Sequence, residues 1–348
     1  MPYGSASVDT FNTSTGQVFS PASSSATMKN RIINGDHRID QRNAGASVTP
    51  ASGASTYITD RFSALQTQAS KFSAQQNQGS VTPPTGFTNY LGLTTASAVS
   101  VGGGDTFFVY QVIEGYNITD LAWGTAGAKA VTLSFYVYSS LTGTFGGSLA
   151  NYLGTASYPF TYTIPSANTW TQISITIPGD TSANWYSNNS TGVGVFFDFG
   201  TSSTYTGPAG AWNSNNNIGA NGTQTNFITT NGATWQLTGV QFEAGNQATS
   251  FDYRDYGNEL RMCQRYYTQI VSTSDYYMLA GRGDGSTGLY FGLPLNVALR
   301  ASPTVTTSAV NCYASGTSVQ STSSTTVPQF NANNPILALY NNGFSGLS

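Results

Sequence analysis

The sequence of 348 residues contains very little charge. Only 8% of its residues are Asp, Glu, Lys or Arg, against about 25% in ordinary globular proteins. Lysine and glutamate occur three times each, and the basic residues are scattered. No run of Lys and Arg could neutralise a series of phosphates, so a nucleic acid is not expected as a partner. The polar surface must instead be built from Ser, Thr, Asn, Gln and Gly.

Histidine and cysteine are almost absent. His37 is the one histidine, and Cys263 and Cys312 are the two cysteines. Without a Cys-x-x-Cys pair or a Cys/His cluster, no structural zinc site is expected. A Ser-His-Asp arrangement would need His37, and no nucleophile elbow or phosphate-binding loop occurs. We therefore expect no catalytic residues and no enzyme, and glycan cleavage by a pair of carboxylates is the weaker alternative.

Long apolar runs are also missing. No stretch of about 18 apolar residues occurs, so no membrane insertion is expected. The first 28 residues are rich in Ser and Thr and carry no charge except Asp9. They lack the basic start and apolar stretch of a secretory signal peptide. Residues 1–29 are expected to form an extended arm that becomes ordered on a partner; the alternative is a flexible terminus.

Aromatic residues are plentiful, with 21 Tyr, 19 Phe and 5 Trp, which argues against disorder and supplies a β core. In segment 130–138 apolar and polar residues alternate, as they do in a half-buried strand. Similar segments and the turn residues between them predict a β-sandwich, with a long Asn/Gly-rich loop at 205–230. The predicted strands are 106–113, 130–138, 160–164, 170–178, 193–199 and 235–242. A short helix at 63–74 is compatible with residue propensity.

Two phrases bracket this β region. The first is N-R-I-I-N-G-D at 30–36, and the second is W-Q-L-T-G-V-Q-F-E-A-G at 235–245. The second runs on into a helical pattern at 254–267 and is followed by L-R-A-S-P-T-V at 299–305. This arrangement resembles virion fibre and tail proteins of tailed bacteriophages, especially those of marine and cyanobacterial hosts. With the phrase T-W-x-x-I-x-I-x-I-P at 169–178, it also resembles carbohydrate-binding modules of the jelly-roll class.

The resemblance implies an all-β protein in four parts. Residues 1–29 would anchor it to the virion, 30–253 would form a jelly-roll β-sandwich, 254–267 a short connecting helix, and 268–348 a small C-terminal β domain. In the last part, 276–281 and 289–294 are expected to form a hairpin around a turn at 281–285.

The resemblance also implies a role and partners. The chain would be a tail or head fibre, a homotrimer assembled in the host cytoplasm, which would keep both thiols free. Its arm would bind other tail or capsid proteins, and its projecting part would bind a host-surface polysaccharide. Two alternatives remain: a tail or capsid adaptor or decoration protein with no receptor role, and a lectin-like glycan-binding module outside a virion.

Loop aromatics beside amides are the candidate glycan-binding residues. Sugars pack their C–H faces on aromatic rings, and their hydroxyls pair with amide groups. The candidates are Trp185, Tyr186, Tyr205, Trp212 and Asn213. The alternative is that these side chains pack beneath their loops or against a neighbouring subunit. Trp170 and Trp235 lie in predicted strands and are assigned to the core.

A calcium ion is the one cofactor considered. The jelly-roll modules that the chain resembles often bind calcium through acidic side chains near the chain start. Asp36 and Glu243, from the opening and closing phrases, are the candidate ligands. Both carboxylates could equally accept hydrogen bonds from backbone donors.

Overall fold

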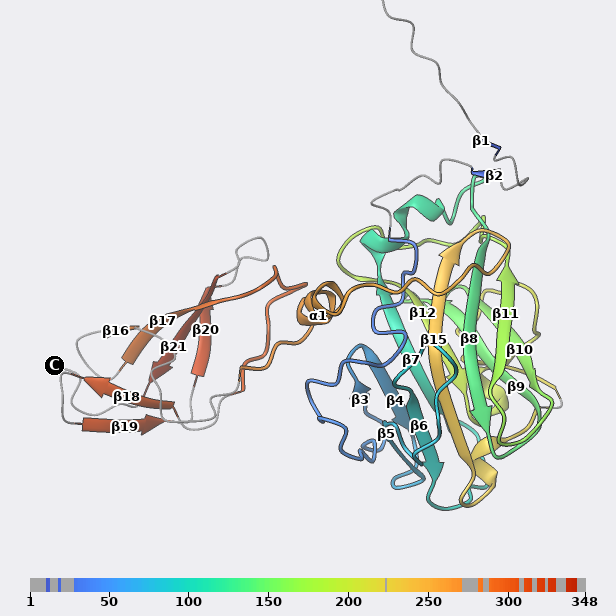
Figure 1. The fold of residues 1–348 in the computed structure, drawn as a ribbon, viewed down its shortest axis with the longest axis horizontal. Coiled ribbons are helices and arrows are strands. Elements are labelled where there is room, and N and C mark those ends of the chain that lie inside the picture. The colour runs from blue at the N-terminus through green and yellow to red at the C-terminus, as the bar shows by residue number, and fades with distance from the viewer. Residues whose placement is uncertain are drawn as a thin grey trace, which may run out of the picture.

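The computed structural model describes residues 11–12, 18–19, 28–222, 224–270, 281–283, 288–306, 310–314, 318–322, 325–329 and 336–342. Two antiparallel sheets face each other and form a β-sandwich (Figure 1). The chain passes repeatedly from one sheet to the other, as in a jelly roll. The expected all-β class is confirmed. Most of the expected N-terminal arm, residues 1–29, lies outside the described residues.

One sheet has six strands and the other has five. The six-stranded sheet has the order β10 (Ser157–Ile164), β9 (Gly143–Asn151), β12 (Thr191–Asp198), β7 (Phe107–Glu114), β4 (Phe62–Gln66) and β3 (Thr56–Thr59). The five-stranded sheet has the order β11 (Thr171–Ile177), β8 (Val131–Ser139), β15 (Thr234–Ala244), β6 (Leu91–Thr95) and β5 (Phe72–Gln76). The last strand of the sandwich, β15, lies inside the five-stranded sheet and pairs with β8 on one side and β6 on the other.

Shorter elements lie in the connections and beyond the sandwich. The short elements are β1 (Phe11–Asn12), β2 (Val18–Phe19), η1 (Gly115–Leu121), η2 (Ser203–Tyr205), β13 (Thr206–Gly207), β14 (Gly219–Ala220) and η3 (Phe227–Thr229). The single described α-helix, α1 (Tyr256–Gln264), follows the sandwich. The C-terminal strands are β16 (Gly281–Gly283), β17 (Gly288–Pro294), β18 (Val310–Ala314), β19 (Ser318–Thr322), β20 (Thr325–Gln329) and β21 (Ile336–Asn342).

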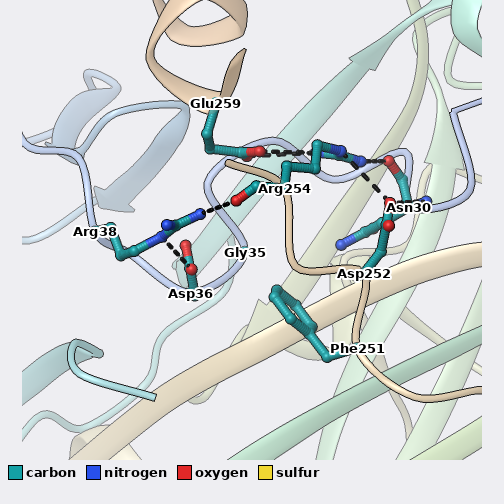
Figure 2. A pocket seen from close by; sticks show the side chains of 8 residues that line it. All are labelled: Asn30, Gly35, Asp36, Arg38, Phe251, Asp252, Arg254 and Glu259. Atoms are coloured by element: carbon teal, nitrogen blue, oxygen red, sulfur yellow. Dashed lines mark hydrogen bonds and ion pairs between the residues drawn. The ribbon is translucent and has the colours of Figure 1, made fainter. Parts of the chain in front are cut away.

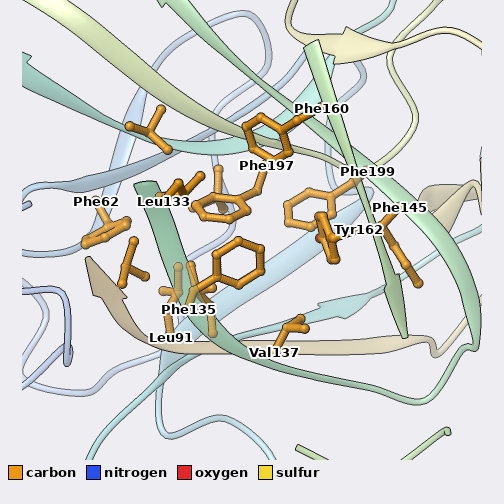
Figure 3. Close-up of a cluster of buried hydrophobic side chains, with 14 of the residues drawn as sticks. Phe62, Leu91, Leu133, Phe135, Val137, Phe145, Phe160, Tyr162, Phe197 and Phe199 are labelled. Atoms are coloured by element: carbon orange, nitrogen blue, oxygen red, sulfur yellow. The ribbon is translucent and has the colours of Figure 1, made fainter. Parts of the chain in front are cut away.

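Aromatic rings fill the space between the two sheets (Figure 3). The ring of Phe135 on β8 meets those of Phe197 and Tyr162 edge-on, at centroid distances of 5.1 and 5.2 Å. Trp235 on β15 is fully buried and packs against Phe199 at 4.9 Å, which confirms its assignment to the core. Burying apolar area contributes roughly 25 cal/mol per Å², so these rings supply much of the stabilisation of the sandwich.

The helix expected at 63–74 is wrong, because this segment forms β4 and β5. Phe62 and Phe72 are fully buried, one on each strand, and they enter opposite sheets. Gln66 holds the turn between them: its side-chain oxygen accepts from the backbone N–H groups of Lys71 (2.9 Å) and Phe72 (3.2 Å). The segment contains two short runs of period two, which together resemble a helix with poor apolar spacing.

Two smaller expectations also fail. Trp170 lies just before β11 and is half-buried on the outer face of the five-stranded sheet, where it packs against Tyr138 at 5.4 Å. Its indole N–H donates to the carbonyl of Thr82 at 2.8 Å. Further on, Gly281–Gly283 is strand β16, paired with β17, and not part of the turn. Most of the partner strand expected at 276–281 lies outside the described residues.

Candidate functional site

Three of the five tryptophans gather at one end of the sandwich. Trp185 and Trp212, which the sequence singled out, meet Trp123, which it did not. Their ring centroids are 4.7 Å apart for Trp123 and Trp185, 5.4 Å for Trp123 and Trp212, and 5.5 Å for Trp185 and Trp212. All three pack against the hydrophobic core. The structure thus brings two candidate glycan-binding residues together, on top of the core.

The polar edges of these indoles already have partners. Trp185 donates its ring N–H to Asp180 Oδ2 at 2.8 Å, and Trp212 donates to the carbonyl of Pro178 at 2.7 Å. Trp185 and Trp212 are half-buried. The cluster is therefore a rigid base beneath the loops, rather than a set of free rings.

Exposed tyrosines stand on the loops around this base. Tyr152, in the turn between β9 and β10, is 68% exposed, and Tyr116 in η1 is 61% exposed. Tyr186 is half-buried, with its ring 6.1 Å from that of Tyr152. The backbone N–H of Tyr116 donates to the carbonyl of Asn188 at 2.9 Å, so the three loops meet. We call Tyr116, Tyr152, Leu153 and Tyr186 the tyrosine tip.

Amide side chains surround the tyrosine tip. Asn184, Asn188 and Asn216 are exposed. Asn151 fixes the turn that carries Tyr152: its side-chain oxygen accepts from the backbone N–H groups of Thr155 (3.0 Å) and Ala156 (3.1 Å), and its amide nitrogen donates to the carbonyl of Asn184 (3.0 Å). The turn and the 181–190 loop are thereby tied together.

Electrostatically the tyrosine tip is neutral. None of its four residues is charged, and the nearby acids have partners. Asp180 is buried and accepts from Trp185 and from the backbone N–H of Ala183. Asp120 forms an ion pair with Arg31 at 2.5 Å. The surface can offer apolar rings and amide hydrogen bonds to a ligand, and it offers no free ionic group of its own.

Two further sequence-predicted residues belong neither to the tyrosine tip nor to the tryptophan cluster beneath it. Tyr205 is half-buried in η2, and its carbonyl accepts from the backbone N–H of Ile218 at 2.8 Å. Asn213 exchanges two backbone hydrogen bonds with Ser157, and its side-chain oxygen accepts from the Ser157 hydroxyl at 3.0 Å. Asn213 therefore holds the long loop against the edge strand β10. Within the described residues, neither has a hydrogen bond or ring contact with the tip.

The two candidate calcium ligands have protein donors of their own. Asp36 pairs with Arg38, and burial raises the pKa of its carboxyl above the usual value. Glu243 accepts from the backbone N–H of Thr249 at 2.9 Å, from its hydroxyl at 2.6 Å and from Gln241 at 2.8 Å. Among the described residues, no three His, Cys, Asp or Glu side chains come close enough to hold a metal. Calcium binding by this pair stays a prediction.

A small recess lies where the opening and closing phrases meet (Figure 2). Arg254 occupies it: its guanidinium pairs with Glu259 at 3.1 Å and donates to the carbonyl of Asn30. Arg38 donates to the carbonyl of Arg254 at 3.0 Å. The recess leaves no room for a water molecule. It is a structural junction that joins both ends of the sandwich to α1.

A second set of charges fixes the residues after α1. Arg265 forms a two-pronged ion pair with Glu114, at 2.6 and 3.0 Å. The Tyr266 hydroxyl donates to the same carboxylate at 2.7 Å, and the Arg61 guanidinium lies over the Tyr266 ring at 3.5 Å. Burial raises the pKa of Tyr266 to about 12. Glu114 ends β7, so this ion pair lies directly before the η1 segment that carries Tyr116.

One further finding concerns membranes. Within the described residues, the structure has no helix with the length and apolar character needed to span a bilayer.

Comparisons with known proteins find no matching family model and no matching curated protein. Several solved structures are similar at low identity. One is the enzymatically active domain of tailspike protein 4 of bacteriophage CBA120, with 12% identity, 62% of this chain covered and a TM-score of 0.33. The match spans about a fifth of that protein, 21% of its length.

Two others are carbohydrate-binding domains of bacteria. A family 11 carbohydrate-binding module from Clostridium thermocellum has 11% identity, covers 58% of this chain and 98% of its own, and has a TM-score of 0.29. The N-terminal cellulose-binding domain of Cellulomonas fimi β-1,4-glucanase C has 12% identity, covers 51% and 90%, and has a TM-score of 0.26. At these values the likeness says nothing of what this chain binds.

Proposed function

We propose that the tyrosine tip binds glycans. The proposal rests on two largely exposed tyrosines, Tyr116 and Tyr152. The loops that carry them are surrounded by exposed asparagines. Single exposed apolar side chains are common on protein surfaces, whereas a contiguous group of them marks an interaction site. Loops rich in Tyr, Ser, Gly and Asn are typical of binding surfaces, because Tyr supplies a large rigid contact area at low entropic cost.

The chemistry of the tip suits a sugar. An aromatic ring packs against the C–H face of a pyranose, and amides pair with its hydroxyls. None of the four tip residues is charged, and the nearby Arg300 guanidinium already donates to the carbonyl of Asn189. We therefore expect neutral oligosaccharides to be the preferred ligands. We propose binding without cleavage of a bond. His37 is fully buried, and burial lowers its pKa to about 3, which supports a structural role for this histidine.

Removing one exposed ring should weaken this binding. We expect Tyr152→Ala to raise the dissociation constant for a neutral oligosaccharide about tenfold, which corresponds to about 1.4 kcal/mol, because the variant loses the apolar contact area of the ring. The measurement is titration calorimetry with the best ligand from a panel of neutral oligosaccharides. Tyr256→Ala is the matched control, because Tyr256 is 55% exposed but lies on α1.

Equal losses in the two variants would contradict a site at the tip. A second outcome is that neither the variants nor the unmodified chain bind any oligosaccharide, neutral or acidic. That result would favour the adaptor or decoration protein with no receptor role. That alternative shares every other feature of the chain.

We further propose that the protein is a structural component of a phage virion, a tail or head fibre, with residues 1–29 as its attachment. The low charge supports this, because a surface with few charges gains little solubility from repulsion and suits a packed assembly. A lectin-like module outside a virion is the other setting for the same binding surface.

The fibre proposal predicts an oligomer. In solution, light scattering should give a mass near three times the 36.7 kDa of one chain, and the trimer should resist SDS without heating. The small C-terminal strands would gain most, since units of this size usually need oligomerisation or other support. A monomer at micromolar concentration would argue against the fibre and favour an adaptor that assembles only on its virion partner.

A further inference from the structure

We propose that Arg300, in the segment between β17 and β18, is a positioning residue for the tyrosine tip. The inference rests on the proposed function. Arg300 and Asn189 exchange two hydrogen bonds: Asn189 Nδ2 donates to the carbonyl of Arg300 at 2.9 Å, and Arg300 Nη1 donates to the carbonyl of Asn189 at 3.0 Å. Asn189 lies in the same loop as Tyr186, three residues further on. A segment more than a hundred residues distant in sequence thus holds the loop that carries a tip residue.

Arg300 is itself held firmly. Its backbone N–H donates to the carbonyl of Arg265 at 3.0 Å, and Arg265 Nη1 donates to the carbonyl of Ala298 at 3.1 Å. Leu299, between them, is buried. Because Arg265 is fixed by its ion pair with Glu114, the segment 298–300 has a defined place against the sandwich.

The contacts close into a ring that contains two of the tip loops. Glu114 precedes Gly115 and Tyr116 in the chain. Gly115 donates its backbone N–H to the carbonyl of Ser190 at 2.8 Å, and Tyr116 donates to the carbonyl of Asn188 at 2.9 Å. The loop from Asn188 to Ser190 is therefore held by η1 on one side and by Arg300 on the other.

This arrangement ties ligand binding to the C-terminal part of the chain. A loop that is held in its binding conformation loses less entropy when a ligand binds, so its affinity is higher. Without the Arg300 side chain the loop keeps its η1 contacts and one bond from Asn189, but it gains freedom around Tyr186. We expect the effect chiefly in the dissociation rate, where most affinity differences between related complexes arise.

The test uses the full chain and three variants: Arg300→Ala, Arg300→Lys and Arg282→Ala. Arg282 is an exposed arginine in β16 and serves as the matched control. The first readout is amide hydrogen exchange in the protein alone at Gly115, Tyr116 and Ser190, whose N–H groups donate to the carbonyl of Ser190, the carbonyl of Asn188 and the side-chain oxygen of Asn188. Exchange should be about fivefold faster in Arg300→Ala, the amount expected for the loss of one hydrogen bond. It should be partly restored in Arg300→Lys, which keeps a donor, and unchanged in Arg282→Ala.

The second readout is the dissociation rate of the neutral oligosaccharide that gives the largest signal with the unmodified chain. It should rise about threefold to tenfold in Arg300→Ala and follow the same order across the variants. Unchanged exchange at these three amides, or a rise spread evenly over the sandwich, would overturn the positioning role. Faster loop exchange with an unchanged dissociation rate would overturn it too. If no oligosaccharide binds the unmodified chain, the proposed function fails, while the exchange result still decides whether Arg300 holds the loop.

Discussion

Arg265→Ala should lower the free energy of unfolding by about 3 kcal/mol, the lower end of the range for a broken buried ion pair. The carboxylate side chain of Glu114 is only 2% exposed, and Arg265 gives it two hydrogen bonds while Tyr266 gives one. Without the guanidinium, a buried carboxylate keeps a single donor. Arg265 is itself partly exposed, which is why we take the lower value. Urea unfolding followed by circular dichroism measures the change.

Arg261→Ala is the control for this experiment. Arg261 lies one turn earlier on α1 and is exposed, and exposed substitutions usually change stability by less than about 0.5 kcal/mol. If both variants lost similar stability, the effect would belong to the helix and its charge rather than to the pair with Glu114. A loss below about 1 kcal/mol for Arg265→Ala would mean that water replaces the guanidinium at Glu114.

Gly35→Ala is expected to destabilise the sandwich by about 2–3 kcal/mol, as overpacking at a rigid contact does. A Cβ at Gly35 would overlap the carbonyl oxygen of Val240 and stand 3.2 Å from its carbon. The obstacle is backbone, which cannot move aside as a flexible side chain could. Val240 also donates its N–H to the carbonyl of Gly35 at 2.9 Å, so the two segments cannot separate without losing this bond. Thermal unfolding by calorimetry would show the loss.

The matched control is Gly103→Ala, in the exposed turn before β7. A Cβ there has no neighbour within 4 Å, so the same substitution should change stability by no more than about 0.5 kcal/mol. If both variants were equally destabilised, the cause would be the loss of a glycine in general. The close approach of Gly35 to Val240 would then not be the cause.

Strands with clean alternation could be predicted from the sequence, because their pattern is local. In β8, Val131, Leu133, Phe135 and Val137 are all fully buried, as the period of two requires. The bracketing phrases also indicated a real closure, since Asn30 Nδ2 donates to the carbonyl of Val240 at 3.0 Å across 210 residues. The alternation within a strand needs no knowledge of distant contacts, whereas this closure is itself a distant contact.

Strand β9 could not be predicted, because its glycines have meaning only in the assembled sheet. Gly147 lies opposite Phe160 on β10 and opposite Phe197 on β12. The ring of Phe160 fills the space where a Cβ of Gly147 would stand, at 2.5 Å. Read alone, such a glycine-rich segment predicts a loop; the two neighbouring strands make it the centre of a sheet.

The candidate site was found only in part for the same reason. Trp185 and Tyr186 were chosen for their amide neighbours in sequence, and both lie at or beneath the tyrosine tip. Tyr116 and Tyr152 were missed, since their place beside Tyr186 depends on hydrogen bonds between loops far apart in the chain. A local signal did exist for Tyr152: with Asn151 and Gly154 around it, the segment reads as a turn that exposes a tyrosine.

The three clustered tryptophans have an optical consequence. Indoles whose centroids lie 4.7 to 5.5 Å apart couple their excited states, so the far-ultraviolet circular dichroism should contain a paired exciton band over the weak β-sheet signal. Only two tryptophans lie outside the cluster. Because Trp185 belongs to the 181–190 loop, movement of that loop would alter the coupling geometry. The circular dichroism of the three tryptophans therefore reports on movement of this loop without an added dye.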